Sequence, residues 1–236
     1  MPVTQQPETI PWSKIKTVIF DMDGTLLDLH FDNYFWLSLL PKSYASAKSL
    51  SFKQAKSLIE DIAQKNIGSL NWYCLDYWET ELDYDLRTLK KTIVEKIKVR
   101  PNVEPFLNQL NVCGKDLILV TNAHPYSLKL KMDLTGIANY FTECISSHDL
   151  GLAKENNGFW KKLMAVEPYD PRQTLLFDDS IAVLRQAKRE GIENLWGVHQ
   201  PDSHQASIQQ AEFPLVKDFM KLIPLNRQNI EIKPNR

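Results

Sequence analysis

The feature that most constrains the fold of this chain is an alternation of short apolar runs with longer amphipathic stretches that end at glycine. The short runs are strand-sized and rich in aliphatic residues, and they lie at 16–20, 116–120, 143–146, 174–177 and 195–198. The amphipathic stretches precede Gly114, Gly136 and Gly191, and they cover 103–112, 125–135 and 181–190. This alternation predicts an α/β fold whose doubly wound parallel sheet is covered by helices on both faces.

The segment 31–98 interrupts the alternation. It has few strand-like runs, and apolar residues at positions 55, 58, 59 and 62 recur at the spacing of one helix face. We therefore expect an inserted helical subdomain at 31–98 and a main domain made of 1–30 and 99–225. The last residues, 226–236, are polar and are expected to form a tail.

The composition is that of a globular protein without a strong overall electrostatic field. Of the 236 residues, 43% are hydrophobic, and 28 Lys and Arg residues balance 29 Asp and Glu residues to a net charge of -1. Such a chain is not expected to attract nucleic acid polymers or membranes. The three cysteines form no CxxC pair, and the N-terminal residues contain no apolar core for a signal peptide or anchor. We therefore expect a cytoplasmic protein that binds a small molecule.

Polar residues follow three of the predicted strands: Asp21, the pair Thr121 and Asn122, and the pair Asp178 and Asp179. In open parallel sheets, ligands bind beyond the carboxyl ends of the strands. These side chains are therefore the first candidates for a functional site.

Two carboxylates, Asp21 and Asp23, leave the end of the first predicted strand together, just before Gly24. Residues two apart on a strand share a face, so both can address one ligand. Paired carboxylates in a cleft repel one another unless a proton or a cation lies between them. A hard divalent cation such as Mg²⁺ meets that need with oxygen ligands.

The run DMDGT at 21–25 resembles the first motif of the haloacid dehalogenase superfamily, which has the form DxDGT. Counterparts of the other family motifs follow in order: Thr121-Asn122 after LILV, Lys154 in GLAKENNGFW, and Asp178-Asp179 after TLLF. Each motif alone has an ordinary explanation, since DxDG occurs in solvated turns, Thr and Asn cap helices, and lysines are usually exposed. Four matches in the family order favour the family.

The resemblance implies a phosphomonoester hydrolase with a Rossmann-like core and a helical cap at 31–98. In such an enzyme Asp21 is the nucleophile that forms an aspartyl-phosphate, and Asp23 is the general acid and then the general base. Three residues are expected to bind the phosphoryl oxygens: Thr121, Asn122 and Lys154. Asp23 also argues against a true dehalogenase, because those members of the family do not keep this second aspartate.

The resemblance also implies a Mg²⁺ cofactor. Its expected ligands are the Asp21 side chain, the Asp23 backbone carbonyl and Asp178. Asp179 is left open as either a further ligand or a neighbour of the ligands.

Four phrases resemble the bacterial GMP/IMP nucleotidase branch of the family: LDLHFDNYFW (27–36), LNWYCLDYW (70–78), TNAHP (121–125) and PDS (201–203). They imply hydrolysis of purine nucleoside 5′-monophosphates to nucleoside and phosphate. The alternatives are a sugar-phosphate phosphatase or phosphomutase on the same machinery and, from another class, a catalytically silent module that binds a phosphorylated ligand. A monomer and a homodimer both remain open.

Aromatic residues of the insertion admit two interpretations, because they can stack on a purine or pack as the core of the helical subdomain: Trp72, Tyr73, Tyr77 and Trp78. Core packing is the commoner fate. Three residues directly after the catalytic loop are expected to contact substrate instead: Phe31, Asp32 and Asn33.

The remaining titratable residues carry weaker signals. His124 precedes Pro125 and can either reach the substrate or cap the next helix. The other histidines show no recognisable ligand spacing and are given no role: His30, His148, His199 and His204. The lysines of the first part of the insertion are interpreted as solvated charges on helices: Lys42, Lys48, Lys53, Lys56 and Lys65.

Overall fold

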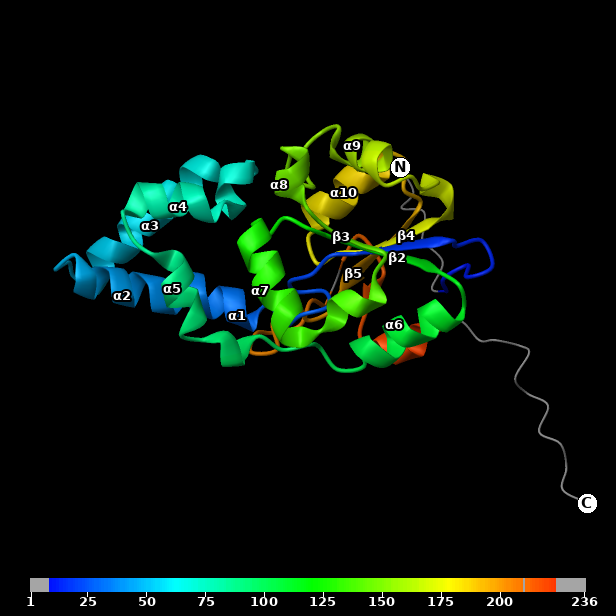
Figure 1. Ribbon diagram of the computed structural model, residues 1–236, viewed down its shortest axis with the longest axis horizontal. Helices are drawn as coiled ribbons and strands as arrows, with labels where there is room; N and C mark the ends of the chain where they lie inside the picture. The colour runs from blue at the N-terminus through cyan, green and yellow to red at the C-terminus, as the bar shows by residue number, and fades with distance from the viewer. Residues whose placement is uncertain (1–8, 210, 224–236) are drawn as a thin grey trace, which may run out of the picture.

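The protein folds around a parallel sheet of six strands in the order β3-β2-β1-β4-β5-β6 (Figure 1). The computed structural model describes residues 9–209 and 211–223, so the polar tail expected at 226–236 lies outside the described residues. The strands are β1 (Thr17–Phe20), β2 (Asp116–Thr121), β3 (Glu143–Ser146), β4 (Thr174–Phe177), β5 (Asn194–Val198) and β6 (Leu215–Val216). The predicted fold class is confirmed.

β1 lies at the centre of the sheet, between β2 and β4. All four of its residues are buried, which explains why its sequence is a continuous apolar run rather than an alternating one. Phe20 is paired in register with Leu119 of β2 and with Phe177 of β4. The three strands therefore end together, and the polar residues that follow them meet at one edge.

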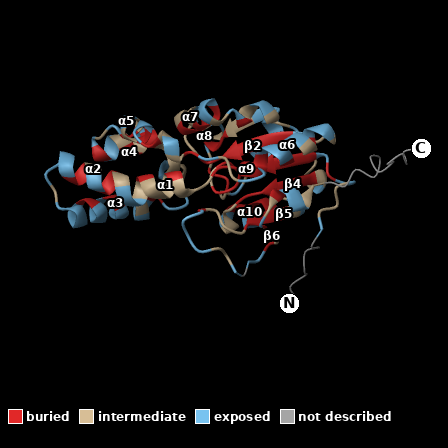
Figure 2. Cartoon of the chain, turned by 90° about the horizontal axis from the view of Figure 1, so that it is seen from below, coloured by how far each residue is buried: buried red, intermediate tan, exposed pale blue. Residues whose placement is uncertain are grey.

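Helices cover both faces of the sheet. On one face, Phe20 and Leu119 pack with residues of α6 (Val103–Val112) and α7 (Pro125–Thr135). On the other face, Ile19 and Val120 pack with α9 (Phe159–Val166) and α10 (Ile181–Arg189). Figure 1 shows α6 and α10 on opposite sides of the strands, and Figure 2 shows that the strands hold much of the buried surface. Alternate strand residues thus point into two separate cores.

The helices expected in the sheet domain form at the predicted places, and glycines end them. Gly114 and Gly191 have positive φ values of 66° and 103° just beyond α6 and α10, a conformation that glycine adopts without steric cost. Two short helices, α8 (Ser147–Leu150) and α9, were not expected, and neither was β6. All three elements are short, and the periodicity of apolar residues is a weak signal over so few residues.

The insertion is helical, as expected. It contains α1 (His30–Tyr34), the π-helical segment η1 (Phe35–Leu39), α2 (Leu40–Ala47), α3 (Phe52–Asn66), the 3₁₀ segment η2 (Leu70–Tyr73), α4 (Leu75–Leu82), α5 (Leu86–Lys91) and the 3₁₀ segment η3 (Val94–Lys96). Ser51 and Gln54 form a reciprocal capping box that begins α3. Of the apolar residues expected on one face of α3, Ala55 and Ile59 are buried, whereas Leu58 is 36% exposed.

The two connections between the insertion and the sheet domain run side by side. The Asp28 backbone N–H donates to the Lys98 carbonyl at 2.9 Å, and the Arg100 N–H donates to the Leu26 carbonyl at 2.9 Å. This pairing supports, as a proposal, domain boundaries near 30/31 and 98/99. In the part of the chain that the structure describes, no helix has both the length and the apolar character needed to cross a membrane.

Candidate active site

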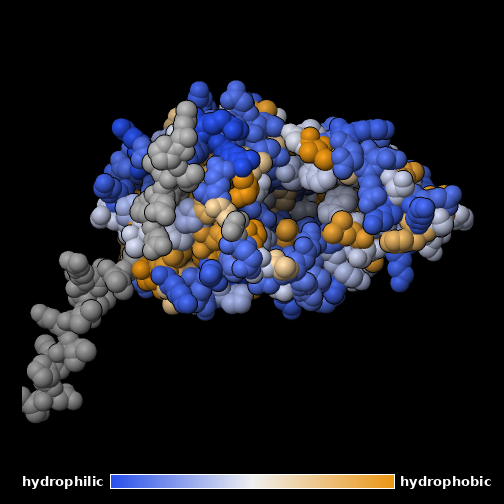
Figure 3. Space-filling model, turned by 180° about the vertical axis from the view of Figure 1, so that it is seen from behind, coloured by the Kyte–Doolittle hydropathy of each residue, from blue (hydrophilic) through white to orange (hydrophobic). Residues whose placement is uncertain are grey.

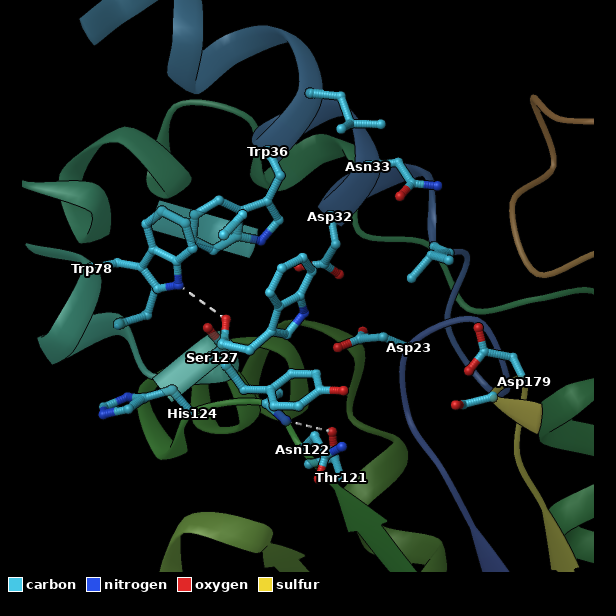
Figure 4. A pocket seen from close by; sticks show the side chains of 18 of the residues that line it. Asp23, Asp32, Asn33, Trp36, Trp78, Thr121, Asn122, His124, Ser127 and Asp179 are labelled. Carbon is cyan, nitrogen blue, oxygen red and sulfur yellow. Dashed lines mark hydrogen bonds between the residues drawn. The ribbon is translucent and has the colours of Figure 1, made fainter. Parts of the chain in front are cut away.

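The carboxyl edge of the sheet and the insertion together enclose a cavity of about 510 Å³. Figure 3 shows a hollow between the two parts of the molecule, and Figure 4 shows the side chains that line it. Every residue predicted for catalysis, phosphate binding or metal binding lines this cavity: Asp21, Asp23, Thr121, Asn122, Lys154 and Asp178. Asp179, which the sequence left undecided, lines it as well.

A buried lysine joins the ends of two strands. Lys154, in the loop between α8 and α9, donates from Nζ to Asp21 Oδ1 at 2.5 Å and to Asp178 Oδ2 at 2.7 Å. It also donates to the Val120 carbonyl at 3.1 Å, and only 2% of the residue is exposed. Burial would lower the pKa of Lys154, but Asp178 and Asp21 together raise it above its ordinary value, so the ammonium group stays charged. We call Lys154, Asp21, Asp178 and Asp179 the Lys154 cluster.

The Lys154 cluster holds more negative than positive charge. One carboxylate oxygen of each of Asp21, Asp178 and Asp179 lies within 4.8 Å of the others. Burial raises the pKa of Asp21 to about 6, and burial followed by repulsion from Asp21 and Asp178 raises that of Asp179 well above its ordinary value. One ammonium group cannot balance three carboxylates. A hard divalent cation fits this donor set, because all of its ligands are oxygens.

Gly24 is required by the approach of the loop after β1 to Asp179. Its φ of 84° lies in the left-handed region, where a side chain is strained. A Cβ atom at this position would also lie 2.5 Å from Asp179 Oδ2. Glycine is therefore required at this position of the DxDG motif for two independent reasons, the backbone conformation and the lack of space for a side chain.

A second buried lysine, Lys131, pairs an aspartate of the sheet domain with one of the insertion. Lys131 of α7 donates to Asp32 Oδ2 at 2.6 Å and lies 2.7 Å from Asp23 Oδ1, as an ion pair rather than a well-directed hydrogen bond. Lys90 of α5 donates to the other oxygen of Asp32 at 3.3 Å. In Figure 4, the carboxyl groups of Asp23 and Asp32 lie close to one another. We call these four residues the Lys131 cluster.

Electrostatics in the Lys131 cluster favour a charged Asp32 and a partly protonated Asp23. Burial and then the charge of Asp32 raise the pKa of Asp23 to about 7, against the lowering effect of Lys131. Burial would raise the pKa of Asp32 as well, but Lys131 and Lys90 lower it below its ordinary value. A carboxyl group with a pKa near neutrality is suited to give up and take back a proton.

The sequence analysis missed Lys90 and Lys131, although each carries a detectable signal. Lys131 lies three residues after buried Leu128, and Lys90 lies four residues after buried Leu86. Both lysines therefore stand on the buried face of their helix. A charged residue in an apolar stripe needs a buried partner, which here is Asp32.

Asn122 and Glu155 tie the floor of the cavity to the insertion. The Asn122 side chain accepts from the Lys154 backbone N–H at 2.9 Å and donates to Glu155 Oε2 at 2.9 Å. The Tyr73 hydroxyl of η2 donates to the other oxygen of Glu155 at 2.9 Å. Thr121 Oγ1 accepts from the Ala123 N–H at 3.0 Å, which fixes the loop after β2. The predicted phosphate-binding pair is therefore held by the chain around it.

The aromatic residues of the insertion divide between the two interpretations. Trp78 is 2% exposed and packs against Trp36, with ring centroids 4.9 Å apart, so it belongs mainly to the core. Trp72 is 36% exposed and lines the cavity with Tyr73. Its own backbone carbonyl accepts a hydrogen bond of 3.0 Å from the Trp78 indole, which holds the segment in place (Figure 4). Trp72 therefore presents an aromatic surface to the cavity.

The residues after the catalytic loop meet the expectation only in part. Asp32 and Asn33 line the cavity, although the Asn33 amide donates to Asp202 at 2.7 Å. Phe31 was wrongly expected to contact substrate, since it is 1% exposed and lies under the ammonium groups of Lys90 and Lys131, 5.0 Å from each. An aromatic face buried beneath two cations stabilises them by cation–π attraction.

His124 has the capping role, because its side chain accepts from the Tyr126 N–H at the start of α7, and it also lines the cavity. Lys56, interpreted as a solvated charge, lines the cavity as well.

Comparisons with known proteins agree with this geometry. The sequence model of the haloacid dehalogenase-like hydrolases matches residues 15–191. The chain is 37% identical over 215 residues to the GMP/IMP nucleotidase YrfG of Escherichia coli strain K12 and to that of Shigella flexneri, covering 91% of this chain and 97% of each relative. In fold it is similar to a HAD phosphatase from Thermococcus onnurineus, with a TM-score of 0.72 at 20% identity over 88% of this chain and 96% of that one.

The family match begins before β1 and ends after α10, so it spans every strand end and loop that contributes to the Lys154 cluster. It covers well over half of the sequence, and the nucleotidase relatives align along nearly the whole of it. The chain is therefore an enzyme that belongs to the haloacid dehalogenase-like hydrolases.

Proposed function

We propose that this protein is a phosphatase that hydrolyses purine nucleoside 5′-monophosphates, with GMP and IMP as substrates. One observation carries the chemistry: the Asp21 carboxylate lines the cavity between Lys154 and further carboxylates. The nucleotidase relatives, similar over nearly their whole length, support the choice of substrate.

In the proposed first step, an Asp21 carboxylate oxygen attacks phosphorus, and the bond from phosphorus to the 5′ oxygen of the nucleoside breaks. Asp23 gives its proton to that departing oxygen, which leaves as the alcohol. In the second step, Asp23 takes a proton from water, the water oxygen attacks the aspartyl-phosphate, and Asp21 is released with inorganic phosphate. A pKa of about 7 for Asp23 is consistent with both duties at neutral pH.

The other polar residues act by position and charge. Lys154 holds the Asp21 side chain and offsets the negative charge of the phosphoryl oxygens as the transition state forms. The Thr121 hydroxyl and the Asn122 backbone N–H are the proposed hydrogen-bond donors to those oxygens. Residues of the insertion also line the cavity, so a bound substrate would displace water from between the two parts of the molecule.

The residues proposed to hold Mg²⁺ are the Asp21 and Asp178 side chains and the Asp23 backbone carbonyl. Asp179 is close enough to Asp21 and Asp178 to be a further ligand or to orient the others. Bound Mg²⁺ would reduce the repulsion between the Asp21 carboxylate and an anionic phosphate.

We propose that the insertion selects the leaving nucleoside, as a cap over the cavity. Trp72 offers an exposed indole face on which a purine base can stack, while Asp32 and Asn33 present polar atoms near the catalytic loop. A mononucleotide fits in the cavity, so its binding does not need the extended basic surface that binds nucleic acid polymers. A cytoplasmic location is proposed on the same grounds, since nucleotides are intracellular metabolites.

The test is phosphate release by the purified protein with Mg²⁺ from GMP, IMP, AMP, pyrimidine monophosphates and a panel of sugar phosphates. We expect GMP and IMP to have the highest kcat/KM. If a sugar phosphate is turned over faster, the phosphatase chemistry stands and the nucleotide assignment is wrong. Transfer of labelled phosphate to another carbon of a sugar would indicate a mutase. If nothing is released, a silent module that binds a phosphorylated ligand is the better explanation.

A further inference from the structure

Three side chains outside the proposed mechanism meet where the insertion touches the sheet domain. Cys74 is the N-cap residue of α4 in the insertion, His124 is the N-cap residue of α7, and His148 lies in α8. One potential ligand atom of each lies within 4.8 Å of the others. The two imidazole rings stand at 71° to one another with centroids 5.1 Å apart.

One ring nitrogen in this cluster has no hydrogen-bond partner among the described residues. The Nε2 atom of His148 is buried, and no residue in the described part of the chain forms a hydrogen bond with it. A buried ring nitrogen without a partner costs free energy, so it is normally satisfied by water, by a proton-sharing neighbour or by a metal ion. Asp76 lies beside the cluster, with its Oδ2 atom 3.4 Å from His124 Nε2, while its Oδ1 atom pairs with Arg87. A fourth ligand of a suitable kind is therefore within reach.

The ligand types differ from those of the Lys154 cluster. Sulfur and imidazole nitrogen prefer borderline transition-metal ions, whereas the carboxylates around Asp21 suit a hard cation. One thiolate, two imidazoles and one carboxylate or water make a tetrahedral set of the kind that Zn²⁺ accepts. With bonds of about 2.3 Å to sulfur and about 2.0 Å to nitrogen, the ligand atoms must draw together by roughly 1 Å, which side-chain rotation can supply.

We propose that Cys74, His124 and His148 form a second metal site, for a borderline divalent ion such as Zn²⁺, with Asp76 as its fourth ligand. His124 binds the ion through Nε2, so its Nδ1 then carries the ring proton and gives up the hydrogen bond that it accepts from the Tyr126 N–H. Cys74 and Asp76 belong to the insertion, whereas the two histidines belong to the sheet domain. A bound ion would therefore hold the insertion against the sheet domain and slow the opening of the cavity. His124 also lines that cavity, so the ion would lie at its wall.

Titration of the metal-free full-length protein with Co²⁺ tests the site directly, because a cobalt ion bound to a thiolate absorbs in the near ultraviolet and one bound only to oxygens does not. We expect one thiolate-bound Co²⁺ per chain, displaced by Zn²⁺. The band should persist in Asp21→Asn, which alters only the carboxylate site, and in Cys113→Ser, which removes a half-buried cysteine at the end of α6. It should be lost in Cys74→Ser.

His148→Gln provides a second variant in case Cys74→Ser does not fold, as judged by circular dichroism. We expect it to weaken Zn²⁺ binding at least about tenfold in competition with a coloured chelator. The same band in the wild type and in Cys74→Ser, or no band in the wild type with excess Co²⁺, would overturn the proposal.

Hydrogen exchange tests the effect on the insertion and does not depend on the proposed catalytic activity. Zn²⁺ should slow amide exchange in α4 and at the start of α7 in the wild type, and leave Cys74→Ser unchanged. If Zn²⁺ binds with the cobalt signature but exchange in α4 is unaltered, the site exists and its role in holding the insertion is wrong.

Discussion

The Lys154 and Lys131 clusters have nearly the same local geometry and different origins. In each, an almost fully buried lysine lies between two carboxylates, at 2.5 and 2.7 Å for Lys154 and at 2.6 and 2.7 Å for Lys131. Every member of the Lys154 cluster comes from the sheet domain. The Lys131 cluster instead joins Asp23 and Lys131 of the sheet domain to Asp32 and Lys90 of the insertion.

The charges of the two clusters differ as well. The Lys154 cluster sets one lysine against three aspartates, while the Lys131 cluster sets two lysines against two aspartates. Acidic groups outnumber lysines in the first cluster, and their numbers are equal in the second. This difference indicates that the Lys154 cluster is built to take up a ligand, whereas the Lys131 cluster is built to hold Asp23 and the docked insertion in one arrangement.

The largest expected effect comes from removing the proposed nucleophile. Asp21→Asn keeps the shape of the side chain and removes its negative charge, so we expect phosphate release from GMP to fall by at least about 10,000-fold. Asp133→Asn, an exposed aspartate of α7, is the matched control and should retain wild-type rates. Appreciable turnover by Asp21→Asn would show that another group carries out the attack.

Breaking the Lys131 cluster should chiefly affect stability. Lys131→Met leaves Asp23 and Asp32 buried without their shared cation, which should cost about 3–5 kcal/mol in the free energy of unfolding measured with urea. Lys129→Met removes an exposed lysine from the same helix, 78% exposed in its side chain, and should cost less than about 1 kcal/mol.

A double-mutant cycle sharpens this test. Asp32 keeps Lys90 as a partner in Lys131→Met, whereas Asp23 loses its paired cation. Asp23→Asn in the Lys131→Met background removes that unpaired charge, so part of the lost stability should return. Equal stability of Lys131→Met and Lys129→Met would mean that the cluster does not hold the insertion in place.

Mg²⁺ is expected to bind to the Lys154 cluster and not to the Lys131 cluster. Because the Lys154 cluster lacks a balancing cation, Mg²⁺ at 100 times its dissociation constant should stabilise the folded protein by about 2.7 kcal/mol, seen as a higher Tm. Asp178→Asn should lose most of this increase, whereas Lys131→Met should keep it. A Tm that does not respond to Mg²⁺ or to a chelator in the wild type would contradict the assignment of the metal site.

The smallest expected effect concerns base recognition. Trp72→Ala removes the exposed indole from the cavity wall, and we expect the KM for GMP to rise by roughly tenfold with little change in kcat, since stacking on a base contributes about 1–3 kcal/mol. Phe52→Ala removes an aromatic side chain of the insertion that is 50% exposed and does not line the cavity. If both variants behave alike, or if the KM for ribose 5-phosphate rises equally in Trp72→Ala, the purine does not stack there.

Much of the fold and of the Lys154 cluster could be predicted because the relevant signals are local. Continuous apolar runs indicate strands buried on both faces, and parallel strands end at a common edge. The residues at the carboxyl ends of β1, β2 and β4 therefore had to meet, and Asp21, Thr121 and Asp178 do so. The DxDG motif added Asp23, and Gly24 follows from the close approach of Asp179.

The Lys131 cluster and the Cys74, His124 and His148 cluster could not be located from sequence spacing. Cys74 and His148 are far apart in the chain and belong to different parts of the molecule, and a lysine on a helix is ordinarily solvated. Phe31 was misplaced for the same reason, since its burial depends on how α5 and α7 pack around it.

Periodicity and turn chemistry thus specified the sheet, its helices and the edge where the candidate site lies, because those features depend on residues close together in the chain. The docking of the insertion determined which charged side chains of the two parts pair with one another. That pairing depends on contacts between helix faces distant in sequence, and the free energy of burying a charge becomes favourable only when the partner from the other part of the molecule is in place.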